Sequence, residues 1–329
     1  MAIKFGVIGG GSWATAIVKM LCENLGEVGW YLRSESVLEH IKNEGHNPHY
    51  LSAVEFDPSK LKLSNDINEI VTYADYLIFA VPSAFVGMEL EKLTTSLNGK
   101  ILFSAIKGIV PESGKVIGQH FHDLYDIPYD NLGVLTGPCH AEEVALERLS
   151  YLTLASANEE HAKVVAKHVS SDYIMTHISD DVMGVEYAAM LKNIYAIAAG
   201  IAHGLGYGDN FQSVLMSNAI REMKKFIKKV HKLKRNINDS AYLGDLLVTG
   251  YSTFSRNRMF GNMIGKGYTV KSAKMEMSMV AEGFYAAESA FKINQKLGAK
   301  TPIINAVYEV LYQGKDAKKT FQKLTEKLD

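Results

Sequence analysis

One lysine lies within the most apolar stretch of the chain. Lys192 belongs to the segment AAMLKNIYAIAAGIA, and one helical turn away from it lie Ala188, Ala189, Tyr195 and Ala196. Such a lysine either reaches water from the rim of the helix or stays buried with a lowered pKa. A lysine with a lowered pKa can donate and accept protons near neutral pH. Its position alone leaves both interpretations open.

Other polar residues gather at points that suit ligand binding. Lys107, in SAIKGIV, follows a predicted strand, and open α/β sheets bind ligands at the carboxyl ends of their strands. The segment LTGPCHAEEVA ends another predicted strand in a Gly-Pro turn. Ser255, Arg256 and Asn257 place a guanidinium between a hydroxyl and an amide, which suits a phosphate or a carboxylate. Each motif alone is more often a loop feature, so their combination carries the prediction.

A glycine-rich turn follows the first predicted strand. Gly9, Gly11 and Ala14 fit the pattern G-x-G-x-x-A between KFGVI and a helical pattern. In that setting the glycines allow a tight turn and a close approach of a pyrophosphate, which the helix N-terminus attracts. A nucleophile elbow around Ser12 is the competing interpretation. It is disfavoured because such elbows follow several strands and no downstream Asp and His pair stands out.

The end of the next predicted strand bears on the choice of dinucleotide. NAD-specific sites usually place Asp or Glu there to bind the ribose hydroxyls. Here VGWYL is followed by Arg33 and Ser34, and Glu35 comes later. Arginine and a small hydroxyl suit a 2′-phosphate, which favours NADPH over NADH. Alternatively, Arg33 belongs to a solvated loop and Glu35 turns inward.

Strand and helix patterns alternate over the first half of the chain. The predicted strands are 4–8, 28–32, 76–81, 100–106, 132–137, 151–156 and 172–177, and the predicted helices are 13–25, 35–44, 66–73, 84–96, 112–124 and 158–169. Nearly continuous apolar strands between helices indicate a parallel sheet covered on both faces. From residue 180 only helices are predicted: 181–204, 211–233, 276–296 and 303–312. We therefore expect an α/β fold, a doubly wound Rossmann-type parallel sheet followed by an all-helical domain. A dinucleotide-binding domain would span 1–180, and a helical substrate and catalytic domain 181–329.

Composition restricts the class of protein further. The 329 residues carry a formal net charge of −1, which argues against a nucleic-acid partner. Two cysteines, Cys22 and Cys139, are too few for a disulfide framework and indicate a reducing compartment. The N-terminus lacks the features of a signal peptide, and the apolar segment 187–206 is interrupted by polar residues. We expect a cytoplasmic protein without integral membrane contact, and the histidines show no metal-site spacing.

Together these motifs resemble the bacterial NAD(P)-dependent glycerol-3-phosphate dehydrogenases. GSWATA resembles the cofactor turn of that family, IKG and GP-x-x-AEEVA its substrate-side loops, and MLKNIYAIAAGIAHGLGYGDN its most distinctive helix. GDLLVT, STFSRNRMFG and VAEGFYA follow in the family's order, so the resemblance spans nearly the whole chain. It implies reversible reduction of dihydroxyacetone phosphate to sn-glycerol 3-phosphate by NADPH or NADH, supplying glycerophospholipid synthesis.

The resemblance also implies roles for individual residues. Lys192 matches the general acid/base. Matched to positions around the substrate are Lys107, Gly137, Cys139, Lys192, Asp245, Ser255, Arg256 and Asn257. Matched to positions near the cofactor are Gly9, Gly11, Ser12, Trp13, Arg33, Lys107, Ala141, Arg256, Val280 and Glu282. The chain departs from the family's pattern at three places. Ala14 replaces a common glycine, Gly250 replaces a common cysteine, and Cys139-His140 stands where many members have Ser-Phe. The last puts a thiol, a weaker hydrogen-bond partner, where a hydroxyl is expected.

A lysine-rich segment, KKFIKKVHKLKR (224–235), carries the strongest run of charge. Phe226, Ile227, Val230 and Leu233 form one apolar stripe, so a solvated face of an amphipathic helix is the favoured interpretation. Weak association with anionic lipid is the alternative, because the product would feed phospholipid synthesis. A phosphorylated small-molecule substrate and a homodimer complete the expected partners. Rival functions are a related dehydrogenase for another hydroxy acid or acyl thioester, and a non-catalytic dinucleotide sensor.

Overall fold

The chain divides into two compact units. The structure, a computed structural model, describes residues 2–277 and 281–329. The sheet unit contains the chain up to Ile106 together with Lys115–Val182, and the helical unit contains Lys107–Gly114 and Met183–Asp329. Segment Lys107–Gly114 thus leaves the sheet unit and belongs with the helices, which the sequence pattern did not indicate. Which ligand each unit binds stays a prediction.

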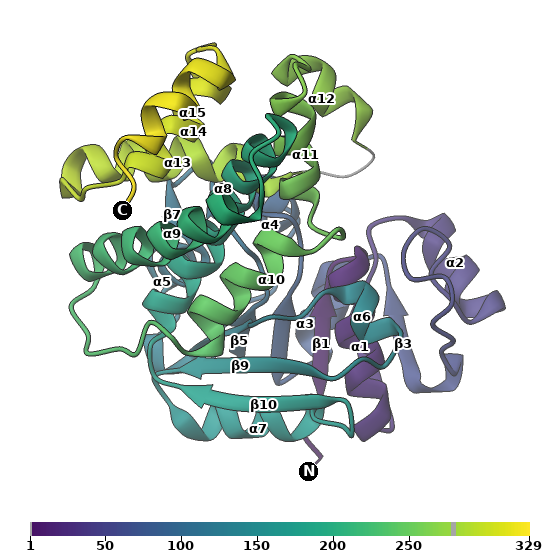
Figure 1. Ribbon diagram of the computed structural model, residues 1–329. Helices are drawn as coiled ribbons and strands as arrows, with labels where there is room; N and C mark the ends of the chain where they lie inside the picture. Colours follow the sequence, from purple (N-terminus) through teal and green to yellow (C-terminus); the bar gives the residue numbers. More distant parts are fainter. Residues whose placement is uncertain (1, 278–280) are drawn as a thin grey trace. The chain divides into compact units, whose positions relative to one another are not determined.

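The sheet unit is built on one large sheet (Figure 1). Within the described residues it has eight strands in the order β10 (Ile174–Ser179), β9 (Ser150–Ser156), β8 (Leu132–Thr136), β5 (Ile101–Ser104), β4 (Tyr76–Phe79), β1 (Phe5–Ile8), β2 (Val28–Tyr31) and β3 (Leu61–Ser64). The strands from β8 to β3 pair in parallel, and so do β9 and β10. The pair of β8 and β9 is antiparallel.

This antiparallel pair corrects the expectation of a wholly parallel sheet. The helix between β8 and β9, α6 (Ala141–Ala145), has five residues. A parallel crossover usually needs a longer helix to carry the chain back along the sheet. With α6 so short, β9 runs in the opposite direction. The predicted fold class, a doubly wound sheet followed by helices, is confirmed.

The central strands of the sheet are buried because helices cover both faces. Every residue of β1, β2 and β4 is buried. Phe5 and Val7 join the core cluster that includes the inner side of α1 (Ser12–Asn24). Gly6 points to the other face, toward α3 (Ile67–Tyr73), where its Cβ position lies 2.8 Å from an Ile70 side-chain carbon. The alternation of side chains along β1 therefore places α1 and α3 on opposite faces.

The remaining elements of the sheet unit are short. They are α2 (Glu35–Glu44), α4 (Val86–Leu90), α5 (Ile117–Tyr125), α7 (Glu159–Val169), the strand β7 (Lys115–Val116), and 3₁₀ turns at Pro58–Lys60, Ser83–Phe85 and Tyr129–Asn131; β6 (Ile109–Val110) belongs to the helical unit. Within the helix predicted over 84–96, the only α-helix of the structure is α4. The helix predicted over 112–124 begins later, at Ile117. The edge strand β3 was missed because exposed Lys62 interrupts its apolar pattern.

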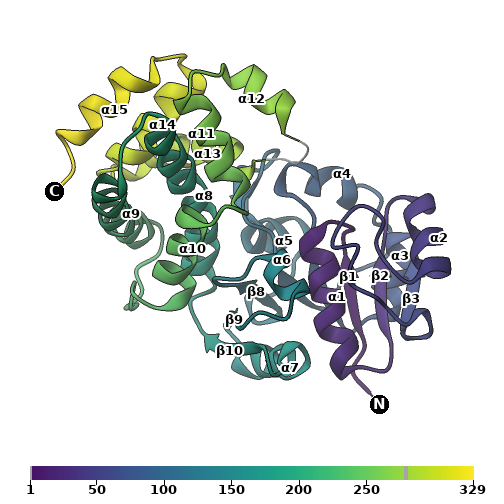
Figure 2. The same ribbon diagram turned by 45° about the vertical axis from the view of Figure 1, so that its right-hand side comes forward.

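The helical unit is arranged around α8 (Figures 1 and 2). Its helices are α8 (Val182–Gly204, of which Val182 falls to the sheet unit), α9 (Asp209–Val230), α10 (Asp245–Tyr251), α11 (Arg256–Gly265), α12 (Val270–Glu276), α13 (Glu282–Leu297), α14 (Pro302–Tyr312) and α15 (Ala317–Thr325), with a π-helical turn at Ser240–Gly244. In both views α9, α10, α11 and α13 surround α8. Among the described helices none is apolar over enough length to cross a membrane.

Two helical predictions need correction. The prediction of a helix over 276–296 was wrong at its start. The structure has α12 ending at Glu276 and α13 beginning at Glu282. The backbone is extended at Met277, directly after α12, and at Ala281, directly before α13. The helix predicted over 211–233 ends at Val230.

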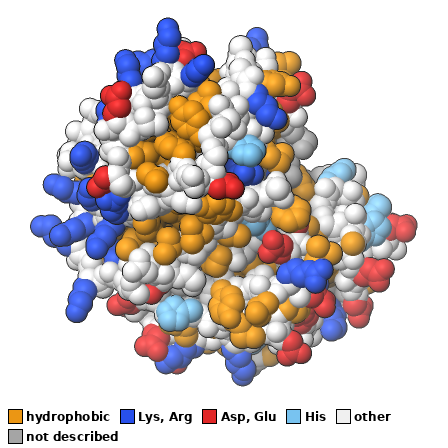
Figure 3. Space-filling view, in the orientation of Figure 1, with side chains coloured by type: hydrophobic (Ala, Val, Ile, Leu, Met, Phe, Trp, Pro, Cys, Tyr) orange, Lys and Arg blue, Asp and Glu red, His pale blue; other side chains and the backbone are white. Residues whose placement is uncertain are grey.

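The lysine-rich segment divides into an apolar and a basic side on α9. Phe226 and Ile227 are fully buried. Four exposed lysines, here called the basic face, lie on the opposite side of α9: Lys224, Lys225, Lys228 and Lys229. Lys and Arg side chains gather over α9 at the left of Figure 3. The amphipathic interpretation is confirmed for residues 224–230, and residues 231–235, including Leu233, lie beyond the helix.

Glycines let α8 and α11 cross at backbone contact. A Cβ on Gly261 would lie 2.2 Å from the carbonyl oxygen of Ile197, and one on Gly200 would lie 2.1 Å from that of Arg258. Backbone atoms cannot rotate away as side chains can, so any larger residue forces the helices apart. This crossing fixes α11, and with it the residues at its N-terminus, against the central helix.

We predict that Gly261→Ala lowers the free energy of unfolding by about 1–3 kcal/mol, because overpacking outweighs the higher helix propensity of alanine. Gly26→Ala is the control, since no described neighbouring atom lies within 4 Å of its Cβ position. Denaturant unfolding of both variants measures the effect. Equal stability of Gly261→Ala and the parent chain would contradict the close crossing.

Candidate functional site

The glycine turn between β1 and α1 requires glycine at its first position. Gly9 has φ of +136°, and a Cβ there would lie 2.6 Å from the carbonyl oxygen of Ala80. At Gly11, the N-cap of α1, no described atom lies within 4 Å of the Cβ position. The backbone is therefore tightly held at Gly9 and open to a ligand at Gly11.

Three buried side chains fix the orientation of this turn by donating hydrogen bonds to its three carbonyl oxygens. The donors are Trp30 Nε1 on Gly9 (2.7 Å), Asn47 Nδ2 on Gly10 (3.2 Å) and Thr15 Oγ1 on Gly11 (3.0 Å). Because the C=O and N–H of one peptide unit point in opposite directions, the next amides face away from these donors. The turn thus presents N–H groups at the N-terminus of a thirteen-residue helix, the arrangement that binds phosphates.

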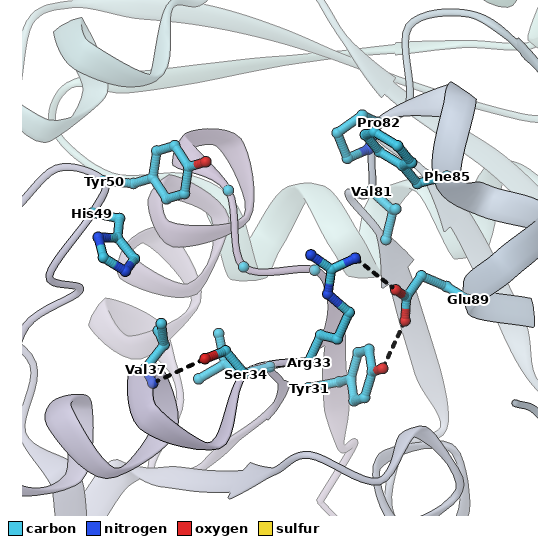
Figure 4. A pocket seen from close by; sticks show the side chains of 14 residues that line it. Tyr31, Arg33, Ser34, Val37, His49, Tyr50, Val81, Pro82, Phe85 and Glu89 are labelled. Carbon is cyan, nitrogen blue, oxygen red and sulfur yellow. Dashed lines mark hydrogen bonds and ion pairs between the residues drawn. The ribbon is translucent and has the colours of Figure 1, made fainter. Parts of the chain in front are cut away.

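A pocket of about 310 Å³ opens beside the turn (Figure 4). It is lined by the glycine turn, by residues 31–34 at the end of β2, by Val37, His49 and Tyr50, and by Val81, Pro82, Phe85 and Glu89. A concave site with apolar walls and a few polar groups suits the adenosine end of a dinucleotide. The residues present therefore fit a nicotinamide dinucleotide, with pyrophosphate on the turn and adenosine in the pocket.

Arg33 and Ser34, which the sequence assigns to a 2′-phosphate, line this pocket, and the phosphate contact itself stays a prediction. The Ser34 hydroxyl also caps α2 by accepting a hydrogen bond from the Val37 amide at 3.4 Å. Glu35 is not among the lining residues, and its carboxylate accepts a hydrogen bond from Asn65. The alternative in which Glu35 replaces Arg33 in the pocket thus gains no support from the geometry.

The other predicted residues of the sheet unit lie close to the chain turns at the carboxyl ends of strands. Ser12 is the buried first residue of α1, and Trp13 follows it half-buried. Gly137 follows β8 with φ of +129°. Cys139 and Ala141 are buried in the core cluster. A contact of Cys139 with substrate stays a prediction.

In the helical unit, Lys192 is fully buried and forms an ion pair with Asp245. Burial lowers the pKa of the Lys192 ammonium from 10.5 to about 8; Asp245 opposes this shift and the neighbouring Lys107 adds to it. Asp245 is the first residue of α10, directly after the π-helical turn at Ser240–Gly244. Such turns are rare in proteins, and those that occur often lie at functional sites. The sequence left Lys192 either buried or solvated, and the structure shows it buried.

A chain of amides connects this lysine to three further segments. Asn193 donates a hydrogen bond to the carbonyl oxygen of Lys107 at 3.3 Å and accepts one from Asn257 at 3.0 Å. The Asn257 oxygen accepts a hydrogen bond from the Gly283 amide at 2.8 Å. Segment 107–114, α8, α11 and α13 are thereby held together around Lys192. No role was predicted for Asn193 from the sequence, although its place beside Lys192 in an apolar helix marks it as a polar residue in need of a partner.

The remaining predicted residues of the helical unit lie next to this network. Ser255 is buried and caps α11 by accepting a hydrogen bond from the Arg258 amide at 3.3 Å. Arg256 is the half-buried first residue of α11, directly before Asn257. Glu282 begins α13, directly before Gly283. Val280 lies outside the described residues. The helical unit therefore brings together Lys107, Lys192 and Asp245 and places the Ser255–Asn257 segment beside them through Asn193.

This arrangement can carry out proton transfer beside an anion site. Lys192 can exist in both protonation states near neutral pH, and Asp245 orients it. The positive charges of Lys107 and Arg256 suit an anionic substrate. Within the described residues no group of three or more His, Cys, Asp or Glu side chains could hold a metal ion.

Known proteins of one family match this chain over nearly its whole length. Sequence models of the NAD-dependent glycerol-3-phosphate dehydrogenase N-terminus and C-terminus match residues 4–162 and 181–322. The NAD(P)+-linked glycerol-3-phosphate dehydrogenase of Macrococcus caseolyticus is 33% identical over 316 residues, covering 95% of each chain. That of Latilactobacillus sakei is 33% identical over 323 residues, 96% of this chain and 94% of the relative.

Solved structures show the same relationship. The crystal structure of glycerol-3-phosphate dehydrogenase from Coxiella burnetii superimposes with a TM-score of 0.90 at 26% identity, covering 98% of this chain and 99% of the other. The complex of D-mandelate dehydrogenase with NADH reaches a TM-score of 0.62 at 16% identity and shares the fold alone. The resemblance stated from the sequence motifs is confirmed: the chain belongs to the NAD-dependent glycerol-3-phosphate dehydrogenase family, and it is an NAD(P)-linked oxidoreductase.

Proposed function

We propose that this protein catalyses the reversible reduction of dihydroxyacetone phosphate to sn-glycerol 3-phosphate, with Lys192 as the general acid/base. The observation that carries the proposal is the buried Lys192 ammonium, paired with Asp245 and lowered in pKa to about 8. A reduced nicotinamide, when bound, supplies the hydride. Supply of the product to glycerophospholipid synthesis is part of the same proposal.

Lys192 acts on the carbonyl oxygen of the substrate. In the direction of reduction, negative charge builds on this oxygen, and the protonated amine stabilises the charge and then donates its proton. In the reverse direction, the neutral amine takes the hydroxyl proton. Asp245 holds the amine in one orientation, and Lys107 adds positive potential for an anionic substrate. A low-dielectric site makes both charge effects stronger than in water.

Residues at the start of α11 bind the phosphate of the substrate. Arg256 is the cation, and Ser255 and Asn257 are its polar neighbours, with Asn257 fixed by its hydrogen bonds to Asn193 and Gly283. Binding energy at the phosphate orients the carbonyl carbon for hydride transfer. Gly137 and Cys139 are further proposed substrate contacts. Gly9, Gly11, Ser12, Trp13, Arg33, Lys107, Ala141, Arg256, Val280 and Glu282 are the proposed cofactor contacts.

We also propose a cytoplasmic homodimer whose basic face on α9 associates weakly with anionic lipid. The exposed lysines of that face support the lipid contact, since clustered cations attract anionic membranes at low salt. Sedimentation equilibrium measures the oligomer, and co-sedimentation with phosphatidylserine vesicles at low salt measures the lipid contact.

The function is tested by following oxidation of NADPH and of NADH with dihydroxyacetone phosphate as substrate. Unphosphorylated dihydroxyacetone and a panel of oxo acids and acyl thioesters run in parallel. Turnover that requires the phosphate supports the proposal. Turnover of an oxo acid or thioester alone would favour a related dehydrogenase, and cofactor binding without turnover would favour a dinucleotide sensor.

We predict that Lys192→Ala lowers kcat about 10²–10⁴-fold and leaves NADPH affinity nearly unchanged, because only the proton donor is lost. Removing one partner of a buried pair also destabilises the fold. The double variant Lys192→Met/Asp245→Asn removes both charges and controls for that effect, and Lys224→Ala controls for loss of an exposed lysine. Activity of the double variant within a few-fold of the parent chain would exclude Lys192 as the acid/base.

We predict that Arg256→Gln raises the KM for dihydroxyacetone phosphate about 10- to 100-fold, since a charge-assisted contact to the phosphate is lost. The kcat/KM for unphosphorylated dihydroxyacetone should change little. Lys266→Gln, an exposed cation just after α11, is the matched control. An unchanged KM for the phosphorylated substrate would remove Arg256 from the anion site.

A further inference from the structure

A buried carboxylate forms part of the wall of the pocket beside the glycine turn. The side chain of Glu89, on α4, is only 6% exposed. One of its oxygens, Oε2, accepts hydrogen bonds from the Tyr31 hydroxyl at 2.7 Å and from Lys92 Nζ at 2.8 Å. These two donors hold the carboxylate in place at the pocket, and Figure 4 shows the contact with Tyr31.

The other oxygen of Glu89 faces Arg33. The Oε1 to Nη1 distance is 3.6 Å, an ion pair without a close hydrogen bond. The Arg33 side chain is 65% exposed, in contrast to that of Glu89. An ion pair of one contact whose cation is largely exposed is weak, because water screens the exposed charge and the long side chain loses freedom. Arg33 is therefore held loosely and can exchange Glu89 for a stronger anion.

The two residues carry opposite preferences for the 2′ position of an adenosine ribose. A carboxylate binds ribose hydroxyls, and an arginine binds a 2′-phosphate in bidentate fashion. Here the arginine follows β2, where NAD-specific sites carry the acid, and α4 supplies the carboxylate instead. A 2′-phosphate bound to Arg33 must displace Glu89 and tolerate its negative charge nearby. An unphosphorylated ribose neither displaces Glu89 from Arg33 nor is repelled by its charge.

We propose that Glu89 is a specificity-determining residue, which competes with the 2′-phosphate of NADPH for Arg33 and so brings the affinities for NADPH and NADH closer together. The inference rests on the proposed function, in which this pocket takes the adenosine end of the cofactor. The contrary role for Glu89 would be to orient Arg33 toward the phosphate. It is disfavoured by the single 3.6 Å contact and the exposure of Arg33.

Glu89→Gln tests the proposal by removing the charge while keeping the size and an acceptor for Tyr31. The probes are 2′,5′-ADP, which carries the 2′-phosphate, and 5′-ADP, which lacks it; calorimetric titration gives both dissociation constants. We predict that Glu89→Gln tightens 2′,5′-ADP about two- to five-fold and leaves 5′-ADP within two-fold. In an Arg33→Gln background the tightening should shrink.

Glu91→Gln is the matched control, since it removes an exposed charge from the same segment outside the pocket lining. Thermal unfolding confirms that the variants fold. An unchanged ratio of the two affinities, or weaker binding of 2′,5′-ADP by Glu89→Gln, overturns the inference and leaves the proposed function standing. Failure of the parent chain to bind either probe overturns both. If Glu89→Gln does not fold, Glu89→Asp decides, because the shorter side chain withdraws the negative charge from Arg33: tighter binding of 2′,5′-ADP with 5′-ADP unchanged supports the competition, and unchanged or weaker binding of 2′,5′-ADP overturns it.

Discussion

The ion pair between Lys192 and Asp245 is the constraint around which the helical unit is organised. Both side chains are buried, and taking two charges out of water has a large desolvation cost that their attraction offsets only in part. Well-packed apolar residues would often be as stable in their place. The pair is therefore better explained by what it does to the lysine. Burial and Lys107 lower its pKa, and Asp245 limits the shift, so that both protonation states are accessible near neutral pH.

The surrounding helices hold this amine with little freedom. Glycines bring the backbones of α8 and α11 into contact, and the amides of Asn193 and Asn257 connect α8 to α11, α13 and segment 107–114. The sheet unit uses the same principle at the glycine turn, where each carbonyl oxygen has a buried donor. In both units, hydrogen bonds from buried side chains fix the groups that are proposed to bind ligands. Preorganisation of this kind avoids rearrangement when charge develops.

Local patterns were sufficient to predict much of this structure. The buried strands, the glycine turn and the apolar helix carrying Lys192 follow from periodicity and residue type. The partners of these elements could not be predicted, because they come from distant points in the chain. Asn47 lies 37 residues from Gly10, and Glu89 lies 56 residues from Arg33. The place of segment 107–114 depends on packing rather than on local sequence, and the direction of β9 depends on the shortness of α6.

The central claim is that Lys192 exchanges the proton of the reaction. It is tested most directly by the pH dependence of kcat in both directions between about pH 6 and 10. Because the pKa of Lys192 is lowered to about 8, reduction should slow as pH rises through that value and the ammonium is lost. Oxidation should accelerate over the same range, since it needs the neutral amine. Profiles that are flat across this range in both directions, or that titrate equally when Lys192 is replaced, would contradict the account.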